Sequence, residues 1–279
     1  MRSLFLILAL AACDDALDQR LAIVDQPRVL AILSEPAEAK PGDTVAFTAI
    51  AGGPDGALDA APSWSFCIAP KPPTQDAAVS AACTGSGSLV AIGDSAALPT
   101  DACTLFGPDV TMADFRPRDP DSTGGYYQPV RADALGAIAF GFPRITCDLP
   151  TAPGDVAHDY QLHYVANANP TLDPIALPPL AADTDVTLTA SWPAAAAESY
   201  LYYDLDSQTL VTRREAMRIS WLATGGALAV DATAVAEDDP ATSASTTWHT
   251  PASGPVTLWF VLRDSRGGVA VQSIATTIP

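Results

Sequence analysis

Residues 256–268 read VTLWFVLRDSRGG, and this stretch decides the fold. One face of the expected strand carries Val256, Leu258, Phe260 and Leu262, and the opposite face carries Thr257, Trp259, Val261 and Arg263. A turn-forming segment at 264–268 and a second apolar run at 269–274 follow directly. Two β-favouring runs joined by a turn rich in Asp and Gly predict an antiparallel hairpin at the end of the chain.

The same period of two recurs upstream in shorter stretches. Met217, Ile219 and Trp221 alternate with polar neighbours, and Trp64 and Phe66 do so in the first part of the chain. The 25 prolines and 18 glycines divide the sequence into short segments, and no helical period is evident. Short alternating strands with frequent turns predict an all-β fold in which antiparallel sheets pack as β-sandwiches.

The later part of the chain repeats the order of the earlier part. An apolar run at 29–33, a Pro-Gly-Asp turn at 41–43 and a strand at 45–50 are paralleled by a run at 172–177, a Pro-Pro and Asp turn, and a strand at 186–192. The sequence Asn-Ala-Asn-Pro at 167–170 is typical of a junction. We therefore predict two sandwich domains, at 28–166 and 167–279.

Three of these features carry a resemblance to a known group of modules. The turn into a strand at 41–45, the tryptophan strand at 63–66 and the closing motif at 258–268 resemble bacterial immunoglobulin-like (Ig-like) and PKD-like modules. Such modules occur on many surface lipoproteins, and the likeness covers 28–66 and 170–279. The resemblance implies β-sandwich domains that act as spacers or binders, although a fold does not by itself fix a function.

The first predicted domain contains a long segment with few strand signals. Residues 68–135 are rich in Pro, Gly, Ser, Thr and Asp, which predicts an insertion made mainly of loops. Order is expected to return at 138–147. Tyr160, Leu162 and Tyr164 then alternate with polar residues and predict another strand.

The N-terminus, MRSLFLILALAAC at 1–13, has the layout of an export signal. Its last four residues resemble a bacterial lipobox, which implies that a signal peptide at 1–12 is removed and that Cys13 carries acyl chains such as palmitate. The seven-residue apolar run at 4–10 is too short to span a membrane, which takes about 20 residues. We expect an extracytoplasmic, lipid-anchored protein with a tether at 13–27, on either the inner or the outer membrane.

Four cysteines remain beyond Cys13, and they suit an oxidising compartment. They are Cys67, Cys83, Cys103 and Cys147. Because they contain no Cys-x-x-Cys pair, a zinc site fits poorly, whereas an even set in an exported protein predicts two disulfides. Three pairings are open. All four fall in the first predicted domain, which suggests that its insertion is stapled.

The charge balance narrows the choice of partners. The formal net charge is −18, and the chain has only two lysines, Lys40 and Lys71. Nucleic acid is excluded as a partner because its phosphates require a basic face. The acidity is typical of a soluble exported surface.

The sequence offers one candidate catalytic set. A strand at 89–92 runs into Gly-Asp-Ser, with Ser95 last, and this resembles the nucleophile block of GDSL-type esterases. Asp155 and His158 resemble the block that supplies the other two members of that triad. The resemblance implies that Ser95 attacks an ester, His158 takes its proton and Asp155 orients the imidazole. The alternative is that Gly-Asp-Ser forms an ordinary turn.

Acidic clusters could supply oxygen ligands to a metal ion, and histidines could supply nitrogen ligands. Weak calcium candidates occur at Asp204 and Asp206, at Glu237, Asp238 and Asp239, and at Asp119 and Asp121. Solvated turns explain the same clusters. His163 and His249 have no partner histidine at ligand spacing, so we expect no transition metal and no required cofactor.

Two tyrosine clusters are candidates for a contact surface. They comprise Tyr126 and Tyr127, and Tyr202 and Tyr203. Exposed tyrosines would offer a large contact area with a polar tip, whereas buried ones would belong to the cores. The sequence therefore predicts a non-enzymatic structural or binding module, adhesive or adaptor in type, that contacts another envelope protein or a glycan. A small cell-surface serine esterase is the alternative.

Overall fold

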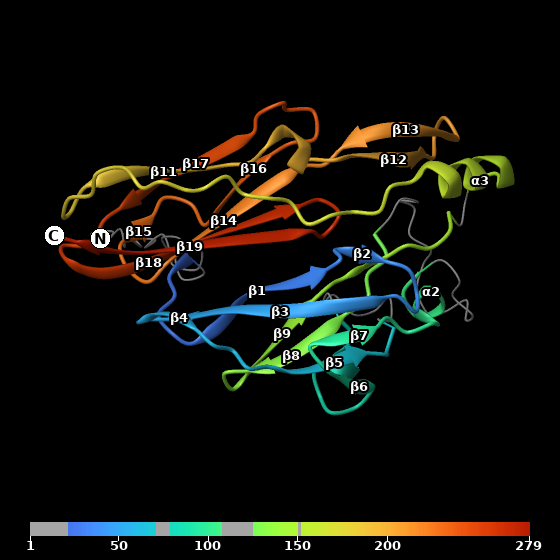
Figure 1. Ribbon diagram of the computed structural model, residues 1–279, viewed down its shortest axis with the longest axis horizontal. Coiled ribbons are helices and arrows are strands. Elements are labelled where there is room, and N and C mark those ends of the chain that lie inside the picture. Colours follow the sequence, from blue (N-terminus) through green and yellow to red (C-terminus); the bar gives the residue numbers. More distant parts are fainter. Residues whose placement is uncertain (1–21, 71–78, 108–124, 150–151) are drawn as a thin grey trace, which may run out of the picture.

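The computed structural model describes residues 22–70, 79–107, 125–149 and 152–279. Nearly half of the described residues form β-strands, arranged mainly in antiparallel sheets, with few short helices (Figure 1). The predicted all-β class is therefore confirmed. The first half is defined here as the strands between residues 28 and 145, which are β1 to β10, and the second half as those between residues 185 and 278, which are β11 to β19.

Two sheets enclose the core of the first half. One contains β1 (Arg28–Glu35), β3 (Thr44–Gly53), β4 (Gly56–Leu58) and β7 (Ser95–Ala97), and the other has the order β6 (Leu89–Ile92), β5 (Ser63–Cys67), β8 (Val130–Ala134), β9 (Ala137–Gly141). Phe47 on β3 lies between Trp64 and Phe66 on β5, with ring centroids 5.7 and 5.9 Å away. These aromatic side chains fill the space between the two sheets.

The second half also has two facing sheets. One has the order β11 (Asp185–Ser191), β17 (Ser243–His249), β15 (Ala227–Leu228), and the other has the order β16 (Ala232–Val235), β14 (Met217–Ala223), β18 (Gly254–Asp264), β19 (Val269–Ile278). Met217, Ile219 and Trp221 point into the shared core, as their alternation predicts. The predicted hairpin at the end of the chain is the β18–β19 pair.

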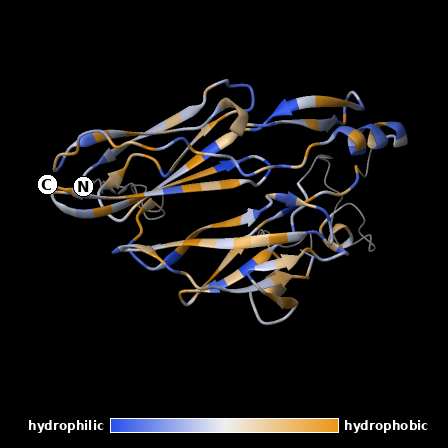
Figure 2. Ribbon diagram, in the orientation of Figure 1, coloured by the Kyte–Doolittle hydropathy of each residue, from blue (hydrophilic) through white to orange (hydrophobic). Residues whose placement is uncertain are grey.

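Strand β18 is buried on both faces, which joins the two halves. Leu258, Phe260 and Leu262 face the core of the second half. Val261 on the other face packs with Ala31 of β1, and Trp259 lies against Gly52 of β3. The four main sheets therefore stack in layers, from β11 and β17 at one side to β5 and β8 at the other (Figure 1), and hydrophobic residues gather on their strands (Figure 2).

The strand predicted from Tyr160, Leu162 and Tyr164 is wrong. Residues Gly154–His163 form helix α3, and Tyr164 is its C-cap. Tyr160 and Tyr164 are four residues apart and therefore share one side of the helix, where their rings stack at 4.5 Å. Leu162 points to solvent at 65% exposure. The helical spacing of four residues between the two tyrosines is also a multiple of two, which is why the sequence pattern predicted a strand.

The loop-rich insertion predicted at 68–135 is also wrong in part. Its described residues include β6, β7, α2 (Ala102–Leu105) and β8, and β5 pairs with both β6 and β8. Strand β8 buries Val130, Ala132 and Ala134 while Arg131 and Asp133 face outward. Buried and outward-facing residues do alternate on β8, but two of its three buried residues are alanines, so the hydrophobic pattern in the sequence is weak.

The tether predicted at 13–27 ends earlier than expected. Ala22 and Val24 are buried, and the amide of Val24 donates to the carbonyl of Ala223 at 2.8 Å. Residues 22–24 therefore pack against the second half before β1 begins, and residues 25–27 are exposed. The predicted signal peptide and Cys13 lie outside the described residues.

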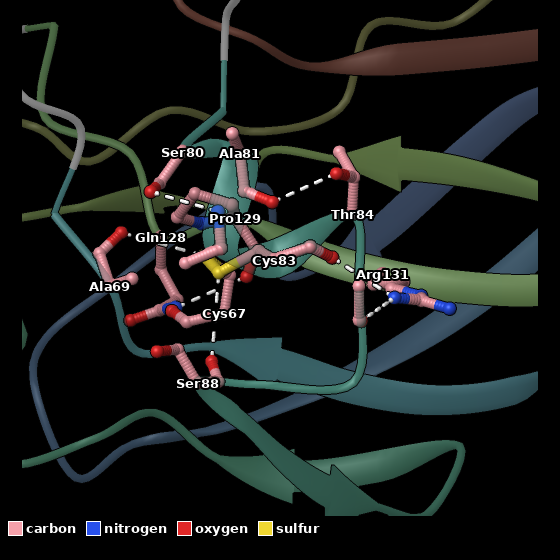
Figure 3. The surroundings of a disulfide bond; sticks show 12 residues. Cys67, Ala69, Ser80, Ala81, Cys83, Thr84, Ser88, Gln128, Pro129 and Arg131 are labelled. Carbon is pink, nitrogen blue, oxygen red and sulfur yellow. Dashed lines mark hydrogen bonds between the residues drawn. A yellow bond between two sulfur atoms is a disulfide. The ribbon is translucent and has the colours of Figure 1, made fainter.

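Both predicted disulfides are confirmed, and the structure selects their pairing as Cys67–Cys83 and Cys103–Cys147. The first closes a loop over the outer face of the β6-β5-β8-β9 sheet (Figure 3). There Arg131 donates to the carbonyl of Cys83 at 3.0 Å, and the Gln128 amide donates to the carbonyl of Cys67 at 2.8 Å. The second disulfide ties α2 to the chain just after β10 (Arg144–Ile145).

Candidate functional site at the junction of the two halves

A buried polar cluster lies where the two halves meet, beyond the apolar contact of β18. Strand β2 (Glu38–Ala39) pairs in parallel with β10 (Arg144–Ile145), which places Glu38 beside Arg144. The turn between β18 and β19 brings Arg266 to the same place. We call this set the junction cluster; its charged members are Glu38, Arg144, Glu198, Glu215, Asp264 and Arg266.

Glu38 is the acceptor at the centre of the first-half side. Its carboxylate receives hydrogen bonds from the Tyr164 hydroxyl at 2.8 Å and from the Asn167 backbone amide at 2.8 Å. The Thr146 hydroxyl donates to it at 3.0 Å, and Arg144 Nε lies 3.3 Å from Oε2. Its side chain is 1% exposed, so these partners replace the water that a carboxyl group binds at the surface.

Arg266 makes the corresponding contacts on the second-half side. Its Nε donates to Glu215 Oε1 at 2.6 Å, and its Nη2 donates to Glu198 Oε2 at 2.8 Å. Its Nη1 donates to the Tyr164 hydroxyl at 3.1 Å. Because Arg144 also donates to that hydroxyl, at 3.3 Å, Tyr164 connects the two guanidinium groups. The side chain of Arg266 is 2% exposed.

The hairpin turn holds Arg266 in place through Asp264. The carboxylate of Asp264 accepts the backbone amides of Arg266 at 2.9 Å and Gly268 at 2.8 Å. The Asn167 amide also donates to it, at 3.2 Å. The closing motif identified in the sequence therefore has a structural role: its Asp shapes the turn, and its second Arg enters the junction.

Burial dominates the titration of the junction cluster. It raises the pKa of Glu215 from 4.5 to about 7; Asp264 adds to this shift, and Arg266 opposes it. Burial also raises the pKa of Asp264, against the hydrogen bonds from Gly268 and Asn167. Burial would lower the pKa of Arg144, but Tyr164 and Glu38 hold it above its ordinary value. Four carboxyl groups thus face two permanently charged guanidinium groups.

A pocket of about 460 Å³ opens beside the junction cluster. It is lined by Lys40, Cys103, Thr146, Cys147, Asp148, Tyr160, Gln161, Tyr164 and Ala166. Tyr164 belongs to both the pocket and the cluster. The volume lies within the range of small-molecule sites, and the lining mixes two aromatic rings with single groups of either charge.

The structure does not bring the predicted esterase triad together. Ser95 is on β7, which pairs with β3, whereas Asp155 and His158 are exposed on α3. Helix α3 packs instead against the hairpin of β12 (Ser199–Asp204) and β13 (Thr209–Arg214), away from β7 (Figure 1). Within the described residues, no hydrogen bond links Ser95 to His158 or His158 to Asp155.

The tyrosine candidates divide into buried and half-buried members. Tyr126 and Tyr203 are 3% and 1% exposed and belong to cores, so neither can form an exposed contact patch. Tyr127 lies at the junction, where Arg144 donates to its hydroxyl at 3.4 Å. Tyr202 is half-buried on β12, with the guanidinium of Arg213 3.6 Å from its ring centroid. Tyr202 therefore remains the member best placed for contact.

The calcium candidates are separate turns in the structure. Asp204 accepts hydrogen bonds from the amides of Asp206 and Ser207 inside the β12–β13 turn, and the bonds from Ser207 lower its pKa. Asp239 accepts from the amide of Ala241, and Glu237 and Asp238 are exposed beside it. In the described parts of the chain, no group of three or more His, Cys, Asp or Glu side chains is placed to hold a metal. Asp119 and Asp121 lie outside these residues.

The sequence did not reveal the junction cluster. A weak signal existed, because Glu38 stands between two alanines and Arg144 between Pro143 and Ile145, positions where a charge must find a buried partner. Nothing in the sequence pairs Glu38 with Arg144, 106 residues away, or either with Arg266.

The helices of the described chain include none with the length and apolarity of a membrane span.

Comparison with known proteins leaves the family open. No protein-family model matches the chain, and no curated protein matches it. One similar solved structure is the adhesin InvE of Yersinia pseudotuberculosis, with 10% identity and a TM-score of 0.23 over 88% of this chain and 58% of that one. Another is the α-2-macroglobulin of Escherichia coli, with 11% identity and a TM-score of 0.24 over 91% of this chain and 20% of that one. The chain spans less than two thirds of either protein, and neither likeness carries an assignment.

Proposed function

We propose that the chain is a lipid-anchored protein of the bacterial cell envelope that acts as a non-enzymatic structural or binding module. The lipobox at 10–13 supports the anchor on Cys13. Two disulfides support an oxidising, extracytoplasmic location, because such bonds are rare where thiols are kept reduced.

The finer fold in this proposal is a pair of Ig-like or PKD-like sandwiches that share one face. Each half has two sheets around its own aromatic core, which supports the sandwich interpretation. The boundary falls in the segment between α3 and β11. Here the chain crosses from the first half to the second through Asn167, which is 3% exposed and bonded to both Glu38 and Asp264.

The observation that carries the function is the way the two halves are joined. Linked modules ordinarily move relative to each other unless their interface is large and apolar. Here Trp259 and Val261 are buried against the first half, and the junction cluster adds charged contacts at the end of the same interface. A body of this kind suits an adaptor or adhesive subunit that presents a surface at a fixed orientation from the membrane.

The partner surface that we propose includes the outer side of the β12–β13 hairpin. Tyr202 and Arg213 lie together there, and Tyr and Arg are the residue types that most often dominate binding energy at interfaces. The partner is another envelope protein or an envelope glycan. Tyr203 faces the opposite side of the hairpin, where α3 covers it.

Photocrosslinking in the native host tests this proposal. A photoreactive phenylalanine analogue replaces Tyr202 in the full chain, and a matched variant carries it at Asp185, an exposed position on β11. We expect a specific crosslinked envelope protein or glycan from position 202 and none from position 185. Crosslinks that are identical at both positions, or absent from both, would contradict the assigned surface.

The anchor is tested separately on the same protein. Intact mass analysis should show acyl chains on the mature protein beginning at Cys13, and Cys13→Ser should abolish them and release the protein from membranes. Membrane fractionation then distinguishes the inner from the outer membrane. A wild-type mass without acylation would overturn the anchored part of the proposal without affecting the binding part.

A further inference from the structure

We infer that the junction cluster is a pH-sensitive latch between the two halves, closed when the cluster holds an extra proton and looser when all four of its carboxyl groups are ionised. This inference rests on the geometry of the junction and holds whether or not the proposed function is correct. It concerns Glu215 above all, because this carboxyl is the most deeply buried member on the second-half side, with a side chain that is 0% exposed.

The interface between the halves has two unlike parts. The apolar part contains Ala31, Val261 and Val269, and the charged side chain nearest to it is Arg263, which contacts the carbonyl of Leu30 and has no carboxyl partner in the described contacts. The ionic part lies at the tip of the β18–β19 hairpin, next to α3 and the β12–β13 hairpin (Figure 1). A loss of attraction at the tip would therefore loosen one end of the interface while the apolar end stays closed.

Charged and titratable groups approach Glu215 from every element packed around it. Arg266 and Asp264 come from the β18–β19 hairpin, Glu198 and Tyr200 from the start of β12, Tyr164 from the end of α3, Glu38 from β2, and Arg144 and Tyr127 from the first-half side. The only permanent positive charges in this set belong to Arg144 and Arg266. With all four carboxyl groups ionised, the cluster would carry an excess of two negative charges.

Such an excess is costly because every charged member of the cluster except Glu198, whose side chain is 28% exposed, is buried, and burial penalises ions that lack a counter-charge. One proton on the cluster halves the excess. Glu215 is the natural acceptor, because its side chain is fully buried and the Asp264 carboxyl repels its charge. These effects outweigh the hydrogen bonds from Arg266 and from the Glu198 amide, which favour the ionised form. The raised pKa of Glu215, about 7, agrees with this assignment.

The direction of the effect follows from linkage. A carboxyl whose pKa is higher in the closed junction than in water binds protons more tightly when the junction is closed. Closure is therefore favoured at low pH and weakened as the pH rises from 4.5 towards 7. If opening returns Glu215 to its ordinary value, the opening equilibrium increases roughly 70-fold between pH 5 and pH 8.

Amide hydrogen exchange of the full chain in detergent tests the latch. The reporter amides are those that donate to carboxylates of the cluster: Asn167 to Glu38, Glu198 to Glu215, and Gly268 to Asp264. The core reference is β18 at 258–262. Exchange at pH 5 and pH 8 is compared after correction for the intrinsic rates. Glu215→Gln is the test variant, and Asp185→Asn, at an exposed pair with His249, is the matched control.

We expect the protection of the reporter amides to fall by tens of fold from pH 5 to pH 8, while the core reference stays more protected at both values. Glu215→Gln should remove most of this pH dependence, and Asp185→Asn should keep it. Wild-type reporter protection that is independent of pH would overturn the latch, and this outcome needs no variant to fold. Reporters that exchange only as slowly as the core at both pH values would also overturn it, because the junction would then open only by global unfolding.

Discussion

The two halves stabilise similar pairs of sheets by different means. In the second half, Trp192, Trp221 and Trp248 fill one continuous core, and no cysteine is present after Cys147. In the first half, the core contains a single tryptophan, Trp64, and two disulfides hold the segments that cross its sheets. Disulfides therefore restrain the half with long connections between its strands, and burial alone stabilises the half whose connections are short.

The largest loss of stability is expected from a substitution in the core of the second half. Trp221 is 1% exposed, packs edge-on against Phe260 at 5.7 Å and donates to Thr233 at 3.0 Å. Trp221→Ala should lower the free energy of unfolding by about 3 to 5 kcal/mol, through lost burial and the cavity left behind. Urea unfolding measures this, with exposed Arg218→Ala on the same strand as the control. Equal effects of the two substitutions would contradict the burial argument.

Removing the longer disulfide is expected to destabilise the first half almost as strongly as Trp221→Ala destabilises the second half. The Cys103–Cys147 bond spans 44 residues, and the Cys67–Cys83 bond spans 16. Loop-closure entropy gives losses of about 4 and about 3 kcal/mol, respectively, when each pair is replaced by serine. Chemical denaturation of the two double variants checks the order. A greater loss from the shorter loop would show that packing around Cys67, and not chain entropy, sets its contribution.

The free energy of unfolding is expected to depend on pH through the junction cluster, where the two halves meet. Because Glu215 has a pKa of about 7 when folded and 4.5 as its ordinary value, the folded chain binds more protons between these values. Its contribution to stability should therefore decrease by about 3 kcal/mol as the pH rises from 4.5 to 7, and should change little above 7. Denaturation at stepped pH values measures the slope. An identical slope in Glu215→Gln would assign it to other carboxyl groups.

The smallest effect is expected at the apolar contact between the halves. A Cβ added at Gly52 would lie 2.7 Å from Trp259 Cζ2, whereas one added at Gly85 would meet nothing within 4 Å. Gly52→Ala should therefore cost about 1 to 3 kcal/mol through overpacking, and Gly85→Ala should be close to neutral. Thermal unfolding of both variants checks this. A neutral Gly52→Ala would mean that the sheets separate slightly at no cost.

The sequence predicted the parts of the fold that depend on local pattern. The alternation around Trp221 is present, because one residue in two is buried on β14, and the β18–β19 hairpin forms around the turn at 264–268. It failed at Tyr160 and Tyr164, where neighbouring polar residues hid a helical spacing, and at 130–134, where alanines gave little contrast. It also could not show that both faces of β18 are buried, since the second face is covered by strands about 200 residues earlier in the sequence.

The candidate site was beyond sequence reasoning for a physical reason. The junction cluster joins Glu38, Arg144 and Arg266, whose contacts depend on how the two cores pack against each other. Single charges in the sequence are ordinary surface residues unless that packing buries them. The tyrosine clusters pointed to the right region, because Tyr127 and Tyr202 lie near the junction and the hairpin, but their neighbours Tyr126 and Tyr203 are core residues.

Differential scanning calorimetry of the disulfide-intact chain at pH 5.5 tests most directly the claim that the two halves form one body. We expect one transition whose calorimetric enthalpy equals its van't Hoff enthalpy. Trp221→Ala should shift this whole transition, although Trp221 lies in the second half alone. Two separable transitions, of which Trp221→Ala shifts only one, would contradict the account and show that the interface of β18 and the junction cluster does not couple the halves.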